Sequence, residues 1–170
     1  MLNRHIAMML AVLKWPSALA SALYAPAAIL LLINEFQKFG SQSFYFLPFF
    51  LGSVSYLAFW YLWIRRLPVS FLSTLEHEIT HCIFAVLTLN RVTGLWSTWR
   101  EGGRMTYTGP GNWLLTISPY FFPTVTVTLL IVMHFMESAG GTTMYFLVGS
   151  SAAYHATSTW TETHHAQTDL

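Results

Sequence analysis

Only 9% of the 170 residues are charged, whereas 54% are hydrophobic and 16% are aromatic. A soluble domain carries about 25% charged residues, so this composition excludes an ordinary water-soluble fold. The formal net charge of +1 comes without a basic tract and gives no indication of a nucleic-acid partner. The single cysteine, Cys82, excludes a disulfide within the chain. The composition therefore favours a protein embedded in a lipid bilayer.

Apolar segments long enough to cross a bilayer recur along the chain. A transmembrane helix needs roughly 20 mostly apolar residues, and the predicted spans are residues 15–35, 43–64, 68–90, 113–135 and 142–160. We expect the first fifteen residues to lie at the membrane interface and to lead into the first helix. The sequence thus predicts an integral, multi-pass membrane protein of the all-α class. Its polytopic bundle of about five helices would form a single transmembrane domain over residues 1–170.

The third predicted span contains an H-E-x-x-H motif formed by His77, Glu78 and His81. On a helix, residues i and i+4 share one face, so the two imidazoles can direct ring nitrogens at one point. Imidazole binds zinc at about 2.0–2.1 Å, and two such ligands form half of a tetrahedral site. Glu78 is placed to accept a proton from a water molecule that zinc activates, which is the role of a general base. The motif therefore predicts a site for one Zn²⁺ per chain.

The surroundings of the motif argue against a purely structural role. Ionisable groups inside a membrane segment are costly and generally functional. No polar face is available to solvate them, because Ile79, Ile83 and Phe84 surround the site. The spacing also excludes the metzincin class, since Phe84 and Leu87 stand where that motif requires glycine and histidine.

A polar segment, residues 91–109, separates the third and fourth predicted spans. Its two ends are rich in β-branched and aromatic residues, and the pair Gly102-Gly103 lies between them. Such a pattern predicts a short β-hairpin that turns at the glycine pair. The simplest interpretation is an interfacial loop with Trp96 and Trp99 among lipid headgroups.

The fourth predicted span contains the stretch SPYFFP, with prolines at positions 119 and 123. Membrane helices tolerate proline where neighbouring groups satisfy the freed carbonyls. We expect this stretch to bend the helix and to make room for a cavity.

A catalytic zinc needs a third protein ligand, and the candidates lie in the C-terminal part of the chain. Asp169 is the only aspartate and is the favoured ligand. His155, Glu162, His164 and His165 remain open as alternative ligands or as residues that orient a ligand. His155 and Glu162, seven positions apart, would share one face of a continuing helix, whereas two adjacent histidines cannot both point the same way.

The order of these parts resembles the site-2 protease family of intramembrane zinc metalloproteases. The shared features are HEITH in an apolar helix, a Gly-Gly hairpin after it, and a later helix that leads to an aspartate in QTDL. The resemblance covers residues 71–170 and is greatest to the small members that lack additional domains. It implies that His77, His81 and Asp169 bind zinc, that Glu78 activates water, and that the hairpin lies beside the active site.

Together, the motif and the resemblance predict a zinc metalloendopeptidase. Its substrate would be a membrane protein or transmembrane peptide, cleaved within or near the bilayer. A helical substrate must unwind before cleavage, and the hairpin around Trp96, Trp99, Gly102 and Gly103 could bind the unwound segment as an added strand.

Two other interpretations remain open. A non-catalytic membrane protein could hold zinc for its structure or for a partner. A membrane di-iron oxidase or desaturase would also use an H-x-x-x-H pair such as His77 and His81. The histidine boxes of that class are typically H-x-x-H-H, however. Before His164 and His165, Thr161 and Glu162 stand where the third histidine of such a box would be expected.

Overall fold

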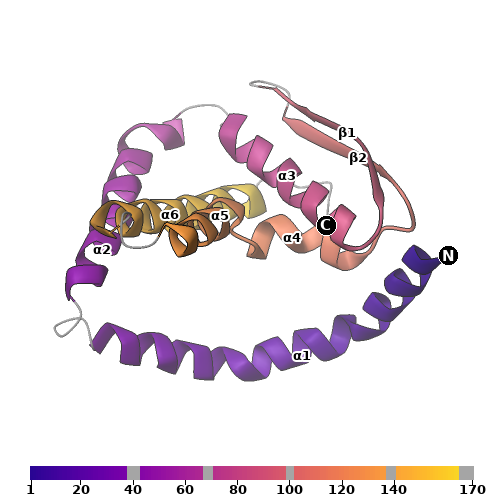
Figure 1. Cartoon of the computed structure of the whole chain (residues 1–170), viewed down its shortest axis with the longest axis horizontal. Helices are drawn as coiled ribbons and strands as arrows, with labels where there is room; N and C mark the ends of the chain where they lie inside the picture. Colours follow the sequence, from indigo (N-terminus) through magenta and orange to yellow (C-terminus); the bar gives the residue numbers. More distant parts are fainter. Residues whose placement is uncertain (38–42, 67–70, 99–101, 137–140, 165–170) are drawn as a thin grey trace.

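The computed structural model describes residues 1–37, 43–66, 71–98, 102–136 and 141–164, without the side chains of residues 35, 36, 43–45 and 164. Within these ranges the order is α1 (Leu2–Gln37), α2 (Ser43–Leu62), the 3-10 helix η2 (Ile64–Arg66), α3 (Phe71–Leu87), β1 (Arg91–Ser97), β2 (Gly103–Thr108), α4 (Trp113–Phe121), α5 (Thr124–Phe135) and α6 (Gly141–His164) (Figure 1). The predicted architecture, mostly helical with one β-hairpin, is confirmed.

The predicted number of five spans is not confirmed. Among the described residues, two helices are long and apolar enough to cross a membrane, Leu2–Asn34 and Phe46–Arg66. Helices α4 and α5 would add a third span if the bent pair counts as one. Helix α3 has only 17 residues, about 25 Å of helix, which is short for a hydrocarbon core of about 30 Å.

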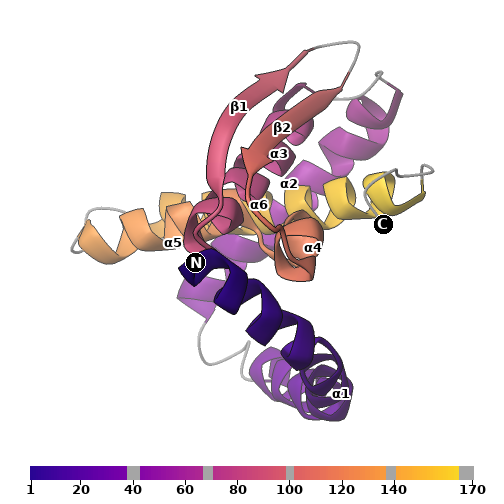
Figure 2. The same ribbon diagram turned by 90° about the vertical axis from the view of Figure 1, so that its right-hand side faces the viewer.

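Helix α1 begins at Leu2 rather than near residue 15, so the first fifteen residues belong to the helix instead of leading into it. Its N-terminal part approaches α4, and the rest of the helix lies apart from the other elements (Figures 1 and 2). None of its apolar window is buried by the rest of the chain. A hydrogen bond joins it to α4, in which Trp113 Nε1 donates to the Leu10 carbonyl at 2.6 Å. The site is therefore built from the later elements.

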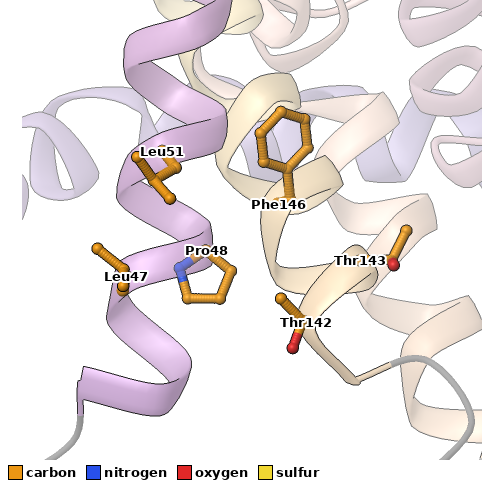
Figure 3. Close-up of a pocket in the computed structure, with 6 residues that line it drawn as sticks. All are labelled: Leu47, Pro48, Leu51, Thr142, Thr143 and Phe146. Carbon is orange, nitrogen blue, oxygen red and sulfur yellow. The ribbon is translucent and has the colours of Figure 1, made fainter.

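Helices α2 and α6 cross in backbone contact at Gly52 and Gly149. A Cβ at either glycine would collide with a carbonyl oxygen of the opposite helix, that of Phe146 or Phe49. Small residues at such crossings let membrane helices approach closely. Toward the first turns of both helices lies an open groove of about 360 Å³. Its lining residues are Leu47, Pro48, Leu51, Thr142, Thr143 and Phe146 (Figure 3).

The predicted bend in the fourth span is present, and it divides residues 113–135 into two helices. Helices α4 and α5 meet at 72° across Phe122 and Pro123. Helix α4 ends as the Phe122 N–H donates to the Ser118 carbonyl at 2.9 Å. Because Pro123 has no N–H and disfavours helical backbone before it, the chain changes direction here.

Helix α3 has an inverted amphipathic pattern. Its exposed residues include the apolar Leu72, Val86 and Leu87. Its buried residues follow the helical period and are mostly polar: Thr74, His77, Glu78, Thr80, His81, Phe84 and Ala85. The H-E-x-x-H motif therefore faces the interior of the protein, and the apolar side faces outward.

The hairpin lies along α3 in both views (Figures 1 and 2). Its strands are antiparallel, with Arg91 opposite Thr108 and Trp96 opposite Arg104. The turn comes earlier than the glycine pair predicts, because Gly103 already belongs to β2 and pairs with Ser97. Gly102 precedes the strand with a left-handed φ of 81°, a conformation that glycine adopts without steric cost.

Candidate functional site

The two histidines of the motif face each other on the buried side of α3. Their Nε2 atoms are 3.1 Å apart, and the rings meet edge to face with centroids 4.8 Å apart. His77 is 9% exposed and His81 is 7% exposed. The helical i, i+4 spacing thus brings together the two side chains that it was expected to bring together.

The other ring nitrogen of His81 is held by the backbone of α4. Its Nδ1 lies 2.8 Å from the Leu115 carbonyl oxygen, and a carbonyl can only accept a hydrogen bond. Leu115 stands in the first turn of α4, where its own N–H donates to the side-chain oxygen of Asn112 at 2.9 Å. The N-cap of α4 therefore places the carbonyl that orients His81.

The other ring nitrogen of His77 is held by a carboxylate from the last turn of α6. Its Nδ1 lies 2.8 Å from Glu162 Oε2. The second carboxylate oxygen, Oε1, accepts hydrogen bonds from Ser73 at 2.7 Å and from Ser158 at 3.1 Å. Glu162 is thus bonded through both oxygens, and its side chain is only 21% exposed.

These contacts determine which nitrogens carry hydrogen in the neutral rings. Both Nδ1 atoms face acceptors, so both carry the hydrogen and both Nε2 atoms present lone pairs. Two lone pairs at this separation repel each other unless a proton or a metal cation lies between them. In a tetrahedral zinc site, ligand distances of 2.0–2.1 Å correspond to a nitrogen separation of roughly 3.3 Å. The pair fits half of such a site.

The side chain of Glu78 projects from α3 toward the hairpin. It is 8% exposed, and strand β2 passes directly over it at Gly103. A Cβ at Gly103 would lie 2.7 Å from Glu78 Cγ and 2.6 Å from Thr74 Cγ2. Only glycine allows the strand to approach this closely. The absence of a side chain at Gly103 therefore brings the hairpin backbone to the motif glutamate.

A network of polar side chains anchors the base of the hairpin between α3 and α4. Asn90, which is 3% exposed, donates to Thr88 Oγ1 at 2.9 Å and accepts from the Gly111 N–H at 3.3 Å. Asn112 donates to the same Thr88 hydroxyl at 3.0 Å. The residue that caps α4 is thus bonded to the segment from which the hairpin leaves α3, so the hairpin and the His81 acceptor share one anchor.

The remaining candidates have different places. His155 lines a small polar cavity beside His77, together with Glu76, Glu162 and other residues. Trp96 is 52% exposed on β1. Asp169, His165 and Trp99 lie outside the described residues, as does the side chain of His164. Among the side chains that are described, no group of three histidine, cysteine, aspartate or glutamate residues could hold a metal ion.

Sequence reasoning did not identify several residues that support the histidines. Ser73 stands one turn before His77, and Ser158 one turn before Glu162. The i, i+4 spacing from a candidate site residue was the available signal. The rings of Tyr120 in α4 and His77 meet edge to face, with centroids 5.5 Å apart. No sequence pattern signals the Leu115 carbonyl, because every residue has a backbone carbonyl.

The comparison with protein families matches this part of the chain. The sequence model of the Peptidase M50B-like family matches residues 50–162, a range that runs from α2 to the last turn of α6. Neither the curated proteins nor the solved structures that were searched gave a match. The match covers most of the chain and includes both histidines, the hairpin and Glu162. The chain therefore belongs to the Peptidase M50B-like family, within the site-2 protease family that its motifs resemble.

Proposed function

We propose that the protein is a multi-pass intramembrane zinc metalloprotease that cleaves a membrane protein or transmembrane peptide. His77 and His81 bind one Zn²⁺ through Nε2, Asp169 supplies the third ligand, and Glu78 acts as the general base. The family match supports a protease, and the apolar helices support a membrane location. The metal, the base and the substrate are the additional parts of the proposal.

The observation that carries the metal centre is the arrangement of the histidine pair. Two Nε2 atoms lie 3.1 Å apart, and both Nδ1 atoms are engaged by acceptors. Histidines that bind a metal almost always donate the other ring N–H to a carboxylate or a backbone carbonyl. This pair has one acceptor of each kind, which supports a metal site over a buried histidine pair with only a packing role.

Zinc bound at this pair would polarise the scissile carbonyl and make water acidic enough to be deprotonated near neutral pH. Glu78 supplies the carboxylate that accepts the proton. Its burial under β2 keeps the carboxylate away from bulk water, so its attraction for a nearby proton or cation is strong. The neighbouring motif histidines lie on the same buried side of α3.

The hairpin supplies the substrate-binding element of the proposal. In a two-stranded sheet each strand has an edge with backbone groups that can pair with an incoming chain. Because Gly103 brings β2 to Glu78, a substrate segment added along the hairpin would lie close to the base. Gly102 directly precedes this position, Trp96 lies on β1 next to Ser97, the partner of Gly103, and Trp99 belongs to the same proposed surface.

The metal centre is tested by the zinc content of protein purified in detergent. We expect near-stoichiometric zinc in the wild type and little in His77→Ala or His81→Ala. A fall in Asp169→Ala would support the aspartate as third ligand, whereas full zinc in this variant would transfer that role to His155, His164 or His165. Absence of zinc from the wild type would contradict the metal centre.

The catalytic step is tested in membranes from cells that express the wild type or Glu78→Gln. Mass spectrometry of newly formed protein N-termini should detect cleavage products of membrane proteins with the wild type alone. Loss of a general base slows a reaction by about 10²–10⁴-fold. Equal cleavage by the variant would refute the role of Glu78. Stoichiometric zinc without any cleavage would favour a non-catalytic zinc protein.

A further inference from the structure

A carboxylate from α6 reaches across the bundle to the first histidine of the motif. We infer that Glu162 is a positioning residue that orients His77 for metal binding, rather than a ligand of the metal. The inference rests on the proposed zinc centre and assigns a role to a residue that the motif does not contain.

The geometry separates Glu162 from the metal-binding edge of His77. The carboxylate contacts Nδ1 at 2.8 Å, whereas Nε2 faces His81 at 3.1 Å. These two nitrogens lie on opposite edges of the imidazole ring. To reach an ion bound at Nε2, Glu162 would have to break its contacts with Nδ1 and with both serine hydroxyls. The observed contacts therefore place Glu162 at the Nδ1 side of the His77 ring, away from the nitrogen that would bind the metal.

Glu162 is held in this position by residues one helical turn from each partner. Ser73 precedes His77 on α3, Ser158 precedes Glu162 on α6, and both hydroxyls reach Oε1. The two serine oxygens are 2.6 Å apart. A buried carboxylate is costly unless its oxygens accept hydrogen bonds, and here both oxygens do. The serines thus fix the carboxylate, and the carboxylate fixes the ring.

The chemical consequence is a defined tautomer. A carboxylate that accepts the Nδ1 hydrogen keeps the lone pair of His77 on Nε2 and increases the basicity of that nitrogen. His81 is oriented instead by the Leu115 carbonyl, a backbone group that no side-chain substitution removes. Of the two acceptors, only the one that holds His77 is therefore a side chain that a substitution can replace.

A second carboxylate in the same region provides a matched control. Glu76 lines the small cavity beside His77 and Glu162, and its Oε1 accepts a hydrogen bond from the Val125 N–H of α5 at 3.1 Å. The amide oxygen of a glutamine can also accept this bond. Glu76→Gln therefore removes a neighbouring negative charge without removing the partner of His77.

The test measures the zinc dissociation constant of full-length protein in detergent by competition with a chromophoric chelator. Loss of a residue that orients a metal ligand typically weakens binding about 10–100-fold. We expect a weakening in that range for Glu162→Ala, a smaller one for Glu162→Gln, whose amide keeps only one accepting oxygen, and for Ser73→Ala, and wild-type affinity for Glu76→Gln. Circular dichroism and gel filtration identify variants that do not fold. If the Glu162 variants fail to fold, Ser73→Ala still tests the inference.

Cobalt substitution separates positioning from direct ligation. At saturating Co²⁺, Glu162→Gln should have the visible absorption spectrum of the wild type, because the set of ligands is unchanged. A spectrum altered by the loss of a ligand would overturn the inference, as would unchanged zinc affinity in both Glu162 variants. Equal weakening by Glu76→Gln would also overturn it, since the effect would then be general electrostatics.

These measurements require no substrate. Failure of the inference would therefore appear in zinc binding, and failure of the protease proposal would appear in cleavage. Weaker zinc binding in the Glu162 variants supports the positioning role even if the wild type cleaves nothing. Absence of zinc binding by the wild type would overturn both the positioning role and the proposed metal centre.

Discussion

Two of the contacts that helix α6 makes are of opposite character. Near its middle, Gly149 meets α2 at Gly52 in backbone contact, and the Ser53 and Ser150 hydroxyls donate to the carbonyls of these glycines at 3.0 and 3.1 Å. In its last turn, Glu162 reaches α3 through a long side chain that bonds three polar groups. The first contact requires the absence of a side chain, and the second requires one particular carboxylate.

The difference follows from what each contact must achieve. Lipid competes equally well for apolar surface, so membrane helices associate mainly through close packing that small residues permit. A polar cluster in the same environment is costly and persists where its groups satisfy one another. We therefore expect substitutions at the α2–α6 crossing to change stability, and substitutions around α3 to change metal binding and catalysis.

The largest effect on stability should come from Gly149→Leu. The added side chain would collide with the Phe49 carbonyl and force the two helices apart. Overpacking costs typically 1–3 kcal/mol, and a clash with backbone lies at or above the upper end, about 3 kcal/mol or more. Thermal unfolding in detergent measures the loss. Gly141→Ala is the control, since no atom lies within 4 Å of its Cβ position, and wild-type stability in both variants would refute the packing argument.

The next largest effect should come from Gly103→Val, which acts on the hairpin. The side chain would displace β2 from Thr74 and Glu78. Misplacement of a catalytic element by about 1 Å can lower a rate by roughly 100-fold. The rate of cleavage should therefore fall by up to about this factor, while zinc content is retained. Gly94→Ala is the matched control in the same hairpin, because its Cβ would meet only the Thr106 hydroxyl. Equal cleavage by both variants would show that the approach of β2 to Glu78 is unimportant.

A smaller effect is expected from Asn112→Ala at the base of the hairpin. The substitution removes the N-cap of α4, which typically costs about 1 kcal/mol, and the bond to Thr88. Asn112→Asp keeps an oxygen for the Leu115 N–H but cannot donate to Thr88. If the cap dominates, thermal unfolding should find Asp close to the wild type and Ala less stable. Equal destabilisation by both variants would assign the greater contribution to the Thr88 bond, which both of them remove.

The smallest effect should come from Ser53→Ala at the α2–α6 crossing. A hydrogen bond between membrane helices contributes about 0.6 kcal/mol on average, and the glycines would keep the backbones in contact without it. The midpoint of thermal unfolding should therefore change much less than in Gly149→Leu. A comparable loss in the two variants would show that the hydroxyl bonds, rather than close packing, hold α2 and α6 together.

Several features of the protein were predictable because they depend on local spacing. The i, i+4 separation of His77 and His81 determines that they share a helix face, and the glycine pair between β-rich segments determines a hairpin. The second proline of SPYFFP, Pro123, determines the break between α4 and α5, whereas Pro119 lies within α4. The number of spans was not predictable in the same way, because α3 and α6 are hydrophobic enough to suggest spans but carry polar residues that only their packing explains.

Only the tertiary structure decided what the site residues contact. The Leu115 carbonyl meets His81 from a helix that begins after the hairpin, and Glu162 meets His77 from the end of α6. These contacts join positions 34 and 85 residues apart, and no local period relates such positions. The sequence by itself determined that two imidazoles face one point. The packing of α4 and α6 against α3 decided which nitrogen of each ring faces it, because that depends on where distant acceptors come to lie.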